Sequence, residues 1–231
     1  MKKLFTAALS ILCAATLASA KPEISASGSV ELYGNYLWRG SQVCGAHLLP
    51  YGEVNIGNFK IDGCGYITFD NSYSEIDVEI SYTIKDFTLM LSDYYNPVND
   101  YFNWNKGESG HALDLQLKYD SSLIPFRASW STMIFGDEYL KDDGNNSFSS
   151  YLELQGYHSF DEFGELSLTA GFNVFKSVYT GFKNSFAPIH LELKYSNSIE
   201  AGSFSFPLSV SYMVNPYDKL GFINASVGIA F

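Results

Sequence analysis

The chain has 231 residues, with 14 Lys or Arg against 25 Asp or Glu, and its formal net charge is −11 at pH 7. So acidic a composition excludes nucleic-acid binding as the main role, because phosphate recognition needs a basic surface. Aromatic residues make up 16% of the chain, which suits a barrel with aromatic girdles at two membrane interfaces.

The chain opens with a targeting segment. Lysines at positions 2 and 3 precede a mostly apolar stretch, residues 4–17, and a small-residue cleavage site ends at Ala20. These are the three parts of a secretory signal peptide. We therefore expect residues 1–20 to be cleaved and residues 21–231 to form one exported domain. No later stretch approaches ~18 continuous apolar residues, so we expect no helix that spans a bilayer.

From residue 29 onward, polar and apolar residues alternate with the period of two that is typical of a β-strand. In residues 75–84, for example, every second residue is apolar and the others are acidic or carry hydroxyl groups. The predicted strands are residues 29–39, 48–56, 59–69, 75–84, 87–95, 111–119, 126–135, 150–160, 165–175, 188–196, 204–214 and 220–231.

The connections between these strands alternate in length. Short links at residues 57–58, 85–86, 120–125, 161–164 and 198–203 alternate with segments that tend to be longer, at residues 40–47, 70–74, 96–110, 136–149, 176–187 and 215–219. This is the layout of an up-and-down membrane barrel with short periplasmic turns and longer outer loops. We therefore predict an all-β fold, a single up-and-down antiparallel transmembrane β-barrel of about twelve strands. Both termini would then be periplasmic.

The last predicted strand, residues 220–231, has an apolar face that ends at Phe231 and an opposite face that is mostly small and polar. In a soluble sandwich the apolar face would be the core, whereas in a membrane barrel it faces lipid. A final strand that ends in Phe resembles the C-terminal signal of bacterial outer-membrane barrels. The resemblance implies the outer membrane of a Gram-negative-type bacterium, with barrel-assembly machinery as a partner that reads Phe231.

The polar faces supply candidate pore-lining residues. They are Glu31, Arg39, Glu53, Asp62, Glu75, Asp77, Glu79, Asp114, Lys118, Arg127, Glu153, Glu192 and Lys194. An acidic wall favours cations, although cross-strand ion pairs that simply fill the barrel are an open alternative. The run Glu75, Asp77 and Glu79 is the set most expected to affect selectivity, because no basic residue interrupts it. Its alternative is a solvated ledge near the outer rim. Twelve strands predict a narrow lumen or one partly plugged by a loop.

One motif resembles a known family. Tyr36-Leu37-Trp38-Arg39-Gly40, followed by Gln42, is similar to the Tyr-Val-Trp-Arg-Gly-x-x-Gln motif that opens the barrels of the TorF-type porins. Leu37 and the shorter spacing to the glutamine depart from that motif. The resemblance implies a small outer-membrane channel of undefined substrate. From the residues alone we expect Trp38 at the outer interface and Arg39 pointing inward, with a structural ion pair that holds the first loop as the alternative for Arg39.

Two further features have more than one interpretation. Cys44 and Cys64 would form a disulfide only if the first loop dipped into the lumen, and two free thiols are the alternative. The loop at residues 96–110 carries Tyr101, Phe102 and Trp104. These side chains would stack a ligand, fold inward as a constriction, or anchor the protein at the interface.

The sequence gives no sign of catalysis. The oxygen-rich residues 142–146 lack the spaced ligands of a calcium loop, and no histidine lies in a recognisable serine-hydrolase setting. We therefore expect no cofactor, no metal and no enzyme. The predicted function is a porin-like channel for passive diffusion of small hydrophilic solutes, with cations or neutral molecules preferred and membrane lipids around it. The alternatives are a closed structural or adhesion barrel and an outer-membrane lipid hydrolase.

Overall fold

The computed structural model describes residues 22–98 and 100–231, so the predicted signal peptide lies outside the described residues. The strands in this part of the chain are β1 (Ile24–Tyr33), β2 (Tyr36–Trp38), β3 (Ser41–Cys44), β4 (His47–Ile56), β5 (Phe59–Thr68), β6 (Ser74–Ile84), β7 (Phe87–Tyr95), β8 (His111–Asp120), β9 (Phe126–Phe135), β10 (Ser150–Ser159), β11 (Glu165–Val174), β12 (Phe186–Ala201), β13 (Phe204–Asn215) and β14 (Leu220–Ala230). Three short 3-10 helices lie in the connections: η1 (Asp137–Tyr139), η2 (Asp161–Phe163) and η3 (Val178–Thr180).

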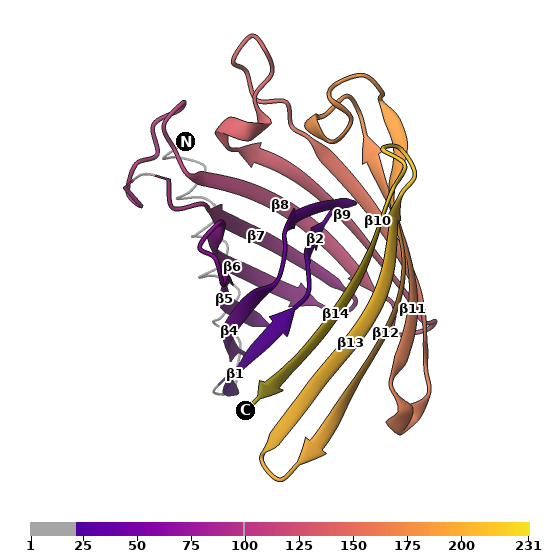
Figure 1. Cartoon of the computed structure of the whole chain (residues 1–231). Helices are drawn as coiled ribbons and strands as arrows, with labels where there is room; N and C mark the ends of the chain where they lie inside the picture. The colour runs from indigo at the N-terminus through magenta and orange to yellow at the C-terminus, as the bar shows by residue number, and fades with distance from the viewer. Residues whose placement is uncertain (1–21, 99) are drawn as a thin grey trace.

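Twelve of these strands close into one antiparallel barrel, and β2 pairs only with β3 (Figure 1). From β4 to β14 each barrel strand pairs with its neighbour in the chain, and β1 closes the ring by pairing with both β4 and β14. The predicted fold, an all-β up-and-down barrel of twelve antiparallel strands, is therefore confirmed. Among the described residues, no helix is long and apolar enough to cross a membrane.

The barrel has an apolar outside and a polar inside. On β6, the side chains of Ile76, Val78 and Ile80 are 37–47% exposed, whereas Glu75 and Asp77 are only 6% and 4% exposed. The two sets alternate along one strand, so they occupy opposite faces of the sheet. This distribution is the reverse of that in a soluble protein, where the apolar face is the buried one.

The two ends of the barrel differ. The turns between β4 and β5 and between β6 and β7 contain two residues each, and the chain ends of the barrel lie at this same end. Gly57 in the first of these turns donates its N–H to the carbonyl of Glu23 at 2.9 Å, and Phe231 is paired with Gly28. The longer connections gather at the opposite end, at the top of Figure 1.

The predicted first strand, residues 29–39, is wrong at both ends. β1 begins at Ile24 and ends at Tyr33, and the residues that follow form the separate β2–β3 hairpin. Arg39 and Gly40 have φ angles of 48° and 87° in its turn. The period of two continues through this hairpin, so alternation alone did not reveal that the chain leaves the sheet.

The predicted strand at residues 188–196 is also corrected. β12 runs from Phe186 to Ala201, and its register with β11 shifts between Gly171 and Phe172. A bulge inserts one extra residue and reverses which face the following side chains occupy. Ile189, which strict alternation places outside, is instead buried against Tyr151 and Ala187.

Candidate functional site: a hairpin across the lumen

The β2–β3 hairpin, residues 36–44, crosses the inside of the barrel, and we call it the lumen hairpin. It begins beside β1, yet its turn reaches Asp114 on β8 and Met133 on β9. β9 is the sixth strand from β1 in either direction around the ring, so the hairpin spans the full width of the lumen. Its sequence signals are the Gly34-Asn35 break and the Arg39-Gly40 turn between two alternating stretches.

Arg39 fixes the turn of the lumen hairpin to the far wall. Its guanidinium forms an ion pair with the carboxylate of Asp114 and donates a hydrogen bond to the hydroxyl of Tyr179, and both partners of the ion pair are buried. The guanidinium carbon also lies 4.4 Å from the ring centroid of Trp38 and 5.3 Å from that of Tyr151, within cation–π range. Burial raises the pKa of the Tyr179 hydroxyl, which therefore stays protonated.

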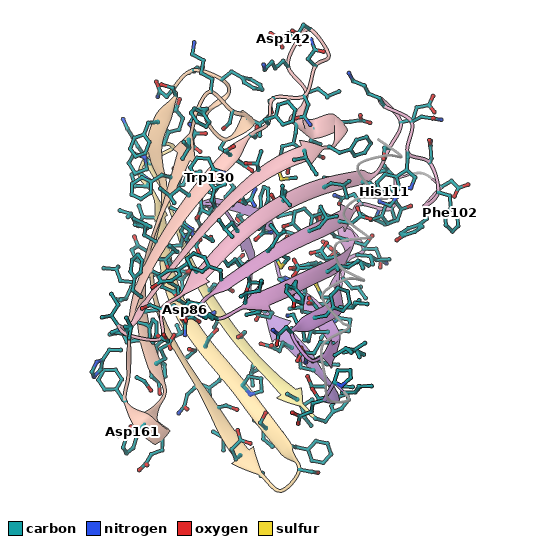
Figure 2. All side chains as sticks on the ribbon, turned by 180° about the vertical axis from the view of Figure 1, so that it is seen from behind. Asp86, Phe102, His111, Trp130, Asp142 and Asp161 are labelled. Atoms are coloured by element: carbon teal, nitrogen blue, oxygen red, sulfur yellow. The ribbon has the colours of Figure 1, made fainter. Side chains whose placement is uncertain are left out.

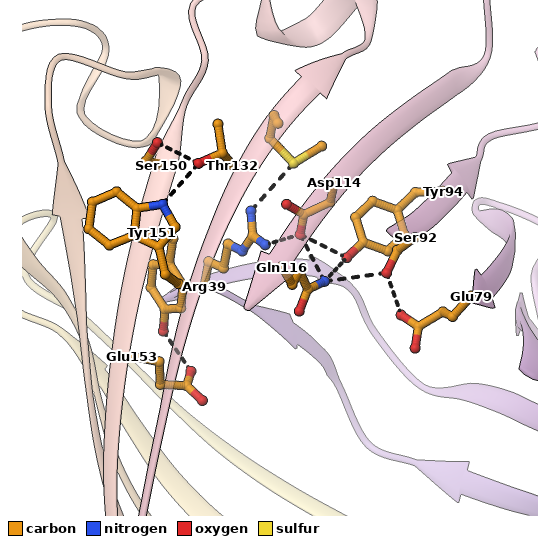
Figure 3. A network of polar contacts seen from close by, with 12 residues as sticks. Arg39, Glu79, Ser92, Tyr94, Asp114, Gln116, Thr132, Ser150, Tyr151 and Glu153 are labelled. Atoms are coloured by element: carbon orange, nitrogen blue, oxygen red, sulfur yellow. Dashed lines mark hydrogen bonds and ion pairs between the residues drawn. The ribbon is translucent and has the colours of Figure 1, made fainter. Parts of the chain in front are cut away.

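A chain of hydrogen bonds extends from this ion pair along the inner wall (Figure 3). Asp114 accepts from Gln116 at 2.9 Å and from the hydroxyl of Tyr94 at 3.2 Å. Gln116 donates to Ser92 at 3.3 Å, and Ser92 donates to Glu79 at 2.8 Å. The turn of the hairpin is thus connected to the acidic face of β6.

Gly40 brings the hairpin close to a third part of the wall. A Cβ atom at this position would overlap the carbonyl oxygen of Ile189, so only glycine fits against β12 here. The carbonyl of Gly40 accepts a hydrogen bond from the side-chain amide of Asn215 at 3.1 Å. The turn is therefore fixed to the wall by its backbone at Gly40 as well as by the side chain of Arg39.

The base of the hairpin is held on the opposite side by tyrosines and a carboxylate. The ring of Tyr36 stacks on that of Tyr66, with centroids 4.0 Å apart. The Tyr36 hydroxyl donates to Glu75 at 3.0 Å, and the Tyr73 hydroxyl donates to the other carboxylate oxygen at 2.7 Å. Asn96 adds a third neutral donor to Glu75 at 3.2 Å.

The lumen hairpin divides the interior into separate spaces. Trp38 lies inside the barrel against Tyr94 and Tyr179, and not at the outer interface as expected. Two cavities, of about 270 and 490 Å³, lie on either side of it towards the loop end. A cavity of about 220 Å³ lies between Tyr66 and Lys194. Two more, of about 480 and 300 Å³, share Lys118 near the short turns. The barrel is therefore partly plugged by its first loop, with space left on both sides.

The candidate pore-lining residues all point into the barrel. Those on strands share the inward face of the sheet, while Arg39 lies in the hairpin turn and not on a barrel strand as expected. The inward strand residues are Glu31 on β1, Glu53 on β4, Asp62 on β5, Glu75, Asp77 and Glu79 on β6, Asp114 and Lys118 on β8, Arg127 on β9, Glu153 on β10, and Glu192 and Lys194 on β12.

Several of these residues form ion pairs along or across the sheet. Lys60 lies 2.9 Å from Asp62 on the same strand and 3.6 Å from Glu53 on β4, and Arg127 on β9 lies 3.0 Å from Glu165 on β11. Within the described residues no ion pair involves Glu75, Asp77 or Glu79. Ion pairs thus fill part of the acidic wall, and Glu75 and Asp77 lie outside them. Glu79 lines the same cavity as Lys60 and Lys118 without a direct ion pair.

Both cysteines are free thiols, although the first loop does dip into the lumen. The sulfur of Cys44 is directed to the carbonyl of Gly45 at 3.6 Å, and that of Cys64 to the carboxylate of Asp77 at 3.8 Å. The structure therefore shows two free thiols, which was the alternative to a disulfide. Each thiol is directed to an acceptor of its own.

The aromatic part of the loop between β7 and β8, residues 101–104, folds against the outside of the barrel and not into the lumen. Trp104 stacks on His111 with ring centroids 3.8 Å apart. The two ring nitrogens of His111 lie 3.0 Å from the carboxylate of Asp93 and 2.6 Å from the backbone carbonyl of Tyr101. Asp93 pairs in register with Val78 of the outward face. His111 and Phe102 lie together at one side of the rim (Figure 2), and Phe102 is 82% exposed. The inward constriction expected as one alternative is thus absent.

Catalytic and metal-binding groupings are likewise not found in residues 22–98 and 100–231. No serine hydroxyl there is hydrogen-bonded to a histidine ring, and no group of three or more His, Cys, Asp or Glu could hold a metal ion.

No family model matches the sequence, and no curated protein matches it. Solved structures with a similar fold include two outer-membrane proteins. An outer-membrane channel from Pseudomonas putida F1 is 10% identical with a TM-score of 0.43, covering 93% of this chain and 97% of that chain. OmpF of Salmonella typhi, in a complex with daunomycin, is 8% identical with a TM-score of 0.35, covering 91% of this chain and 98% of that chain. At these low identities and scores, neither similarity indicates a function for this chain.

Proposed function

We propose that this protein is an outer-membrane, porin-like channel for passive diffusion of small hydrophilic solutes. The observation that carries the proposal is the closed ring of twelve strands with an apolar outside and a polar inside. In lipid a sheet must close, because unpaired backbone groups cost several kcal/mol each. An apolar outer face suits hydrocarbon, and a polar interior holds the water that a solute needs.

The lumen hairpin would act as the constriction of this channel. It spans the barrel, and cavities lie on both sides of it. A narrow passage lined by unmatched carboxylates favours cations over anions. We therefore propose that the passage beside Glu75, Asp77 and Glu79 gives a preference for cations and neutral solutes.

The same proposal assigns an orientation and an assembly partner. The short turns and the chain ends would be periplasmic, and the longer loops would face outward, as in other barrels of this architecture. Phe231, at the end of β14 next to Gly28, would be the residue that the barrel-assembly machinery reads. The exposed aromatic residues of loop 96–110, Phe102 among them, would anchor the outer rim in the lipid interface.

A closed structural barrel is the second candidate, and the contacts of the lumen hairpin with both walls favour it. Single-channel recording of the refolded mature chain in a planar bilayer under a salt gradient separates the two. We expect discrete conductance steps with a cation-selective reversal potential. A folded, inserted chain that gives no steps would be a structural barrel, and conductance that appears only when the hairpin is shortened would identify the hairpin as its plug.

A further inference from the structure

The cavity of about 270 Å³ at the loop end, which we call the outer cavity, has an unusual lining. Aromatic side chains, among them Tyr36, Trp38 and Tyr73, share it with the carboxylates Glu75, Asp137 and Glu138, and no lysine or arginine lines it. The cavity on the other side of Trp38 contains both Arg39 and Lys183. Two cavities separated by one hairpin thus differ in charge.

Glu75 is the most deeply placed carboxylate of the outer cavity. It is 6% exposed, and its three hydrogen-bond donors, Tyr36, Tyr73 and Asn96, are all neutral. A buried carboxylate is costly unless a cation compensates it. The other carboxylates differ: Asp137 accepts from the backbone N–H groups of residues 107 and 109, and Glu138 is exposed.

A second observation concerns the next carboxyl group along the strand. Asp77, the next inward residue on β6, is 4% exposed, and its Oδ1 has no hydrogen-bond partner within the described residues. Arg39 and Lys60 are committed elsewhere, to Asp114 and to Asp62. The region beneath the outer cavity therefore has a buried carboxyl oxygen without a hydrogen-bond partner, and no ion pair with a lysine or arginine among the described residues.

We propose that the outer cavity binds a small organic cation, an alkylamine whose ammonium group pairs with Glu75 while its apolar stem lies against the tyrosine and tryptophan rings. Aromatic faces attract ammonium groups, most strongly where water is excluded. This inference rests on the proposed channel function and names a substrate class for it. The solute would be held at Glu75 before it passes Asp77.

The lining fits this class better than two others. An inorganic divalent cation needs several oxygen ligands at one point, and no such grouping exists among the described residues. A neutral sugar would use the aromatic faces but would leave the charge of Glu75 uncompensated. An alkylamine fits both parts of the lining, because its ammonium group compensates the charge of Glu75 and its apolar stem packs on the aromatic rings.

Titration calorimetry of the refolded mature chain in detergent tests the proposal without requiring conduction. Putrescine is the probe, 1,4-butanediol the uncharged control, and sodium chloride the inorganic control. We expect saturable binding of putrescine only. Glu75→Gln should weaken it roughly tenfold or more, because it removes a charge-assisted contact. Glu162→Gln, in the exposed turn at the other end, should leave binding unchanged.

A second pair of variants decides the matter if Glu75→Gln does not fold. Val43 lines the outer cavity, whereas Ser41, two residues earlier on the same hairpin, lines the cavity that contains Arg39. Val43→Arg should abolish putrescine binding, and Ser41→Arg should retain it.

Three results would overturn the inference. They are no saturable binding of putrescine, binding of butanediol as tight as that of putrescine, and an equal loss of putrescine binding in Val43→Arg and Ser41→Arg. Failure of the channel proposal looks different, because a chain that conducts no ions in a bilayer would still bind putrescine in detergent. A chain that conducts ions but does not bind putrescine would refute the alkylamine site and leave the channel proposal standing.

Discussion

At the scale of single residues, the ion pair between Arg39 and Asp114 controls how firmly the lumen hairpin is held. Removing one partner of a buried pair costs about 3–5 kcal/mol, because the other charge is left uncompensated. We expect Arg39→Met to release the hairpin while the barrel persists, since the twelve strands keep their own hydrogen bonds. Amide hydrogen exchange should show lost protection confined to residues 36–44.

The double variant Arg39→Met with Asp114→Leu is the matched control for this pair. It removes both charges, so protection should recover part of the loss seen in the single variant. Unchanged protection in the single variant would mean that the hydrogen bond of Asn215 to Gly40, and not the ion pair, holds the hairpin. Equal loss in the single and double variants would mean that the contacts of Arg39 with Tyr179 and the aromatic rings, and not the uncompensated charge of Asp114, decide how firmly it is held.

Neighbouring residues on β6 test which face meets lipid. Val78→Arg should cost ~2–4 kcal/mol of unfolding free energy near the bilayer midplane, because Val78 faces outward. Asp77→Asn should leave folding intact, because its carboxylate faces the lumen without a cation. Urea unfolding from lipid vesicles measures both unfolding free energies. A larger loss for Asp77→Asn than for Val78→Arg would mean that the face of β6 that carries Asp77 meets the lipid.

At the scale of elements, the lumen hairpin and residues 100–107 both belong to connections at the loop end of the barrel, but only the hairpin crosses the lumen. Replacing residues 37–42 with a short Gly-Ser linker should raise single-channel conductance severalfold, because the narrowest section is removed. Replacing residues 100–107 in the same way should leave conductance unchanged, since that loop packs on the outer face. A conductance that the hairpin replacement does not change would place the constriction elsewhere.

At the scale of the whole molecule, the period of two and the alternation of loop lengths were enough to predict the barrel, the number of its strands and the direction of nearly every charged side chain. Both signals are local and repeat at each strand.

The lumen hairpin was missed because its two short strands keep the same period, and its place depends on contacts of Arg39 and Gly40 with strands far away in the sequence. Ile189 was misplaced because a bulge leaves no mark on composition.

The distribution of charge along the barrel axis gives the last prediction. Lys60, Lys118 and Arg127 lie near the short turns. Glu75 and Asp77 lie towards the loop end without an ion pair, and Glu79 lies between the two groups, in the cavity that Lys60 and Lys118 also line. Cation selectivity should therefore arise in the outer half of the lumen. The triple variant Glu75→Gln, Asp77→Asn, Glu79→Gln should move the reversal potential under a salt gradient most of the way to the non-selective value. Glu153→Gln with Glu165→Gln, in the half that already contains lysine and arginine, should move it little. If the second variant shifts the potential as far as the first, selectivity is a property of net charge and not of the acidic face beside the hairpin.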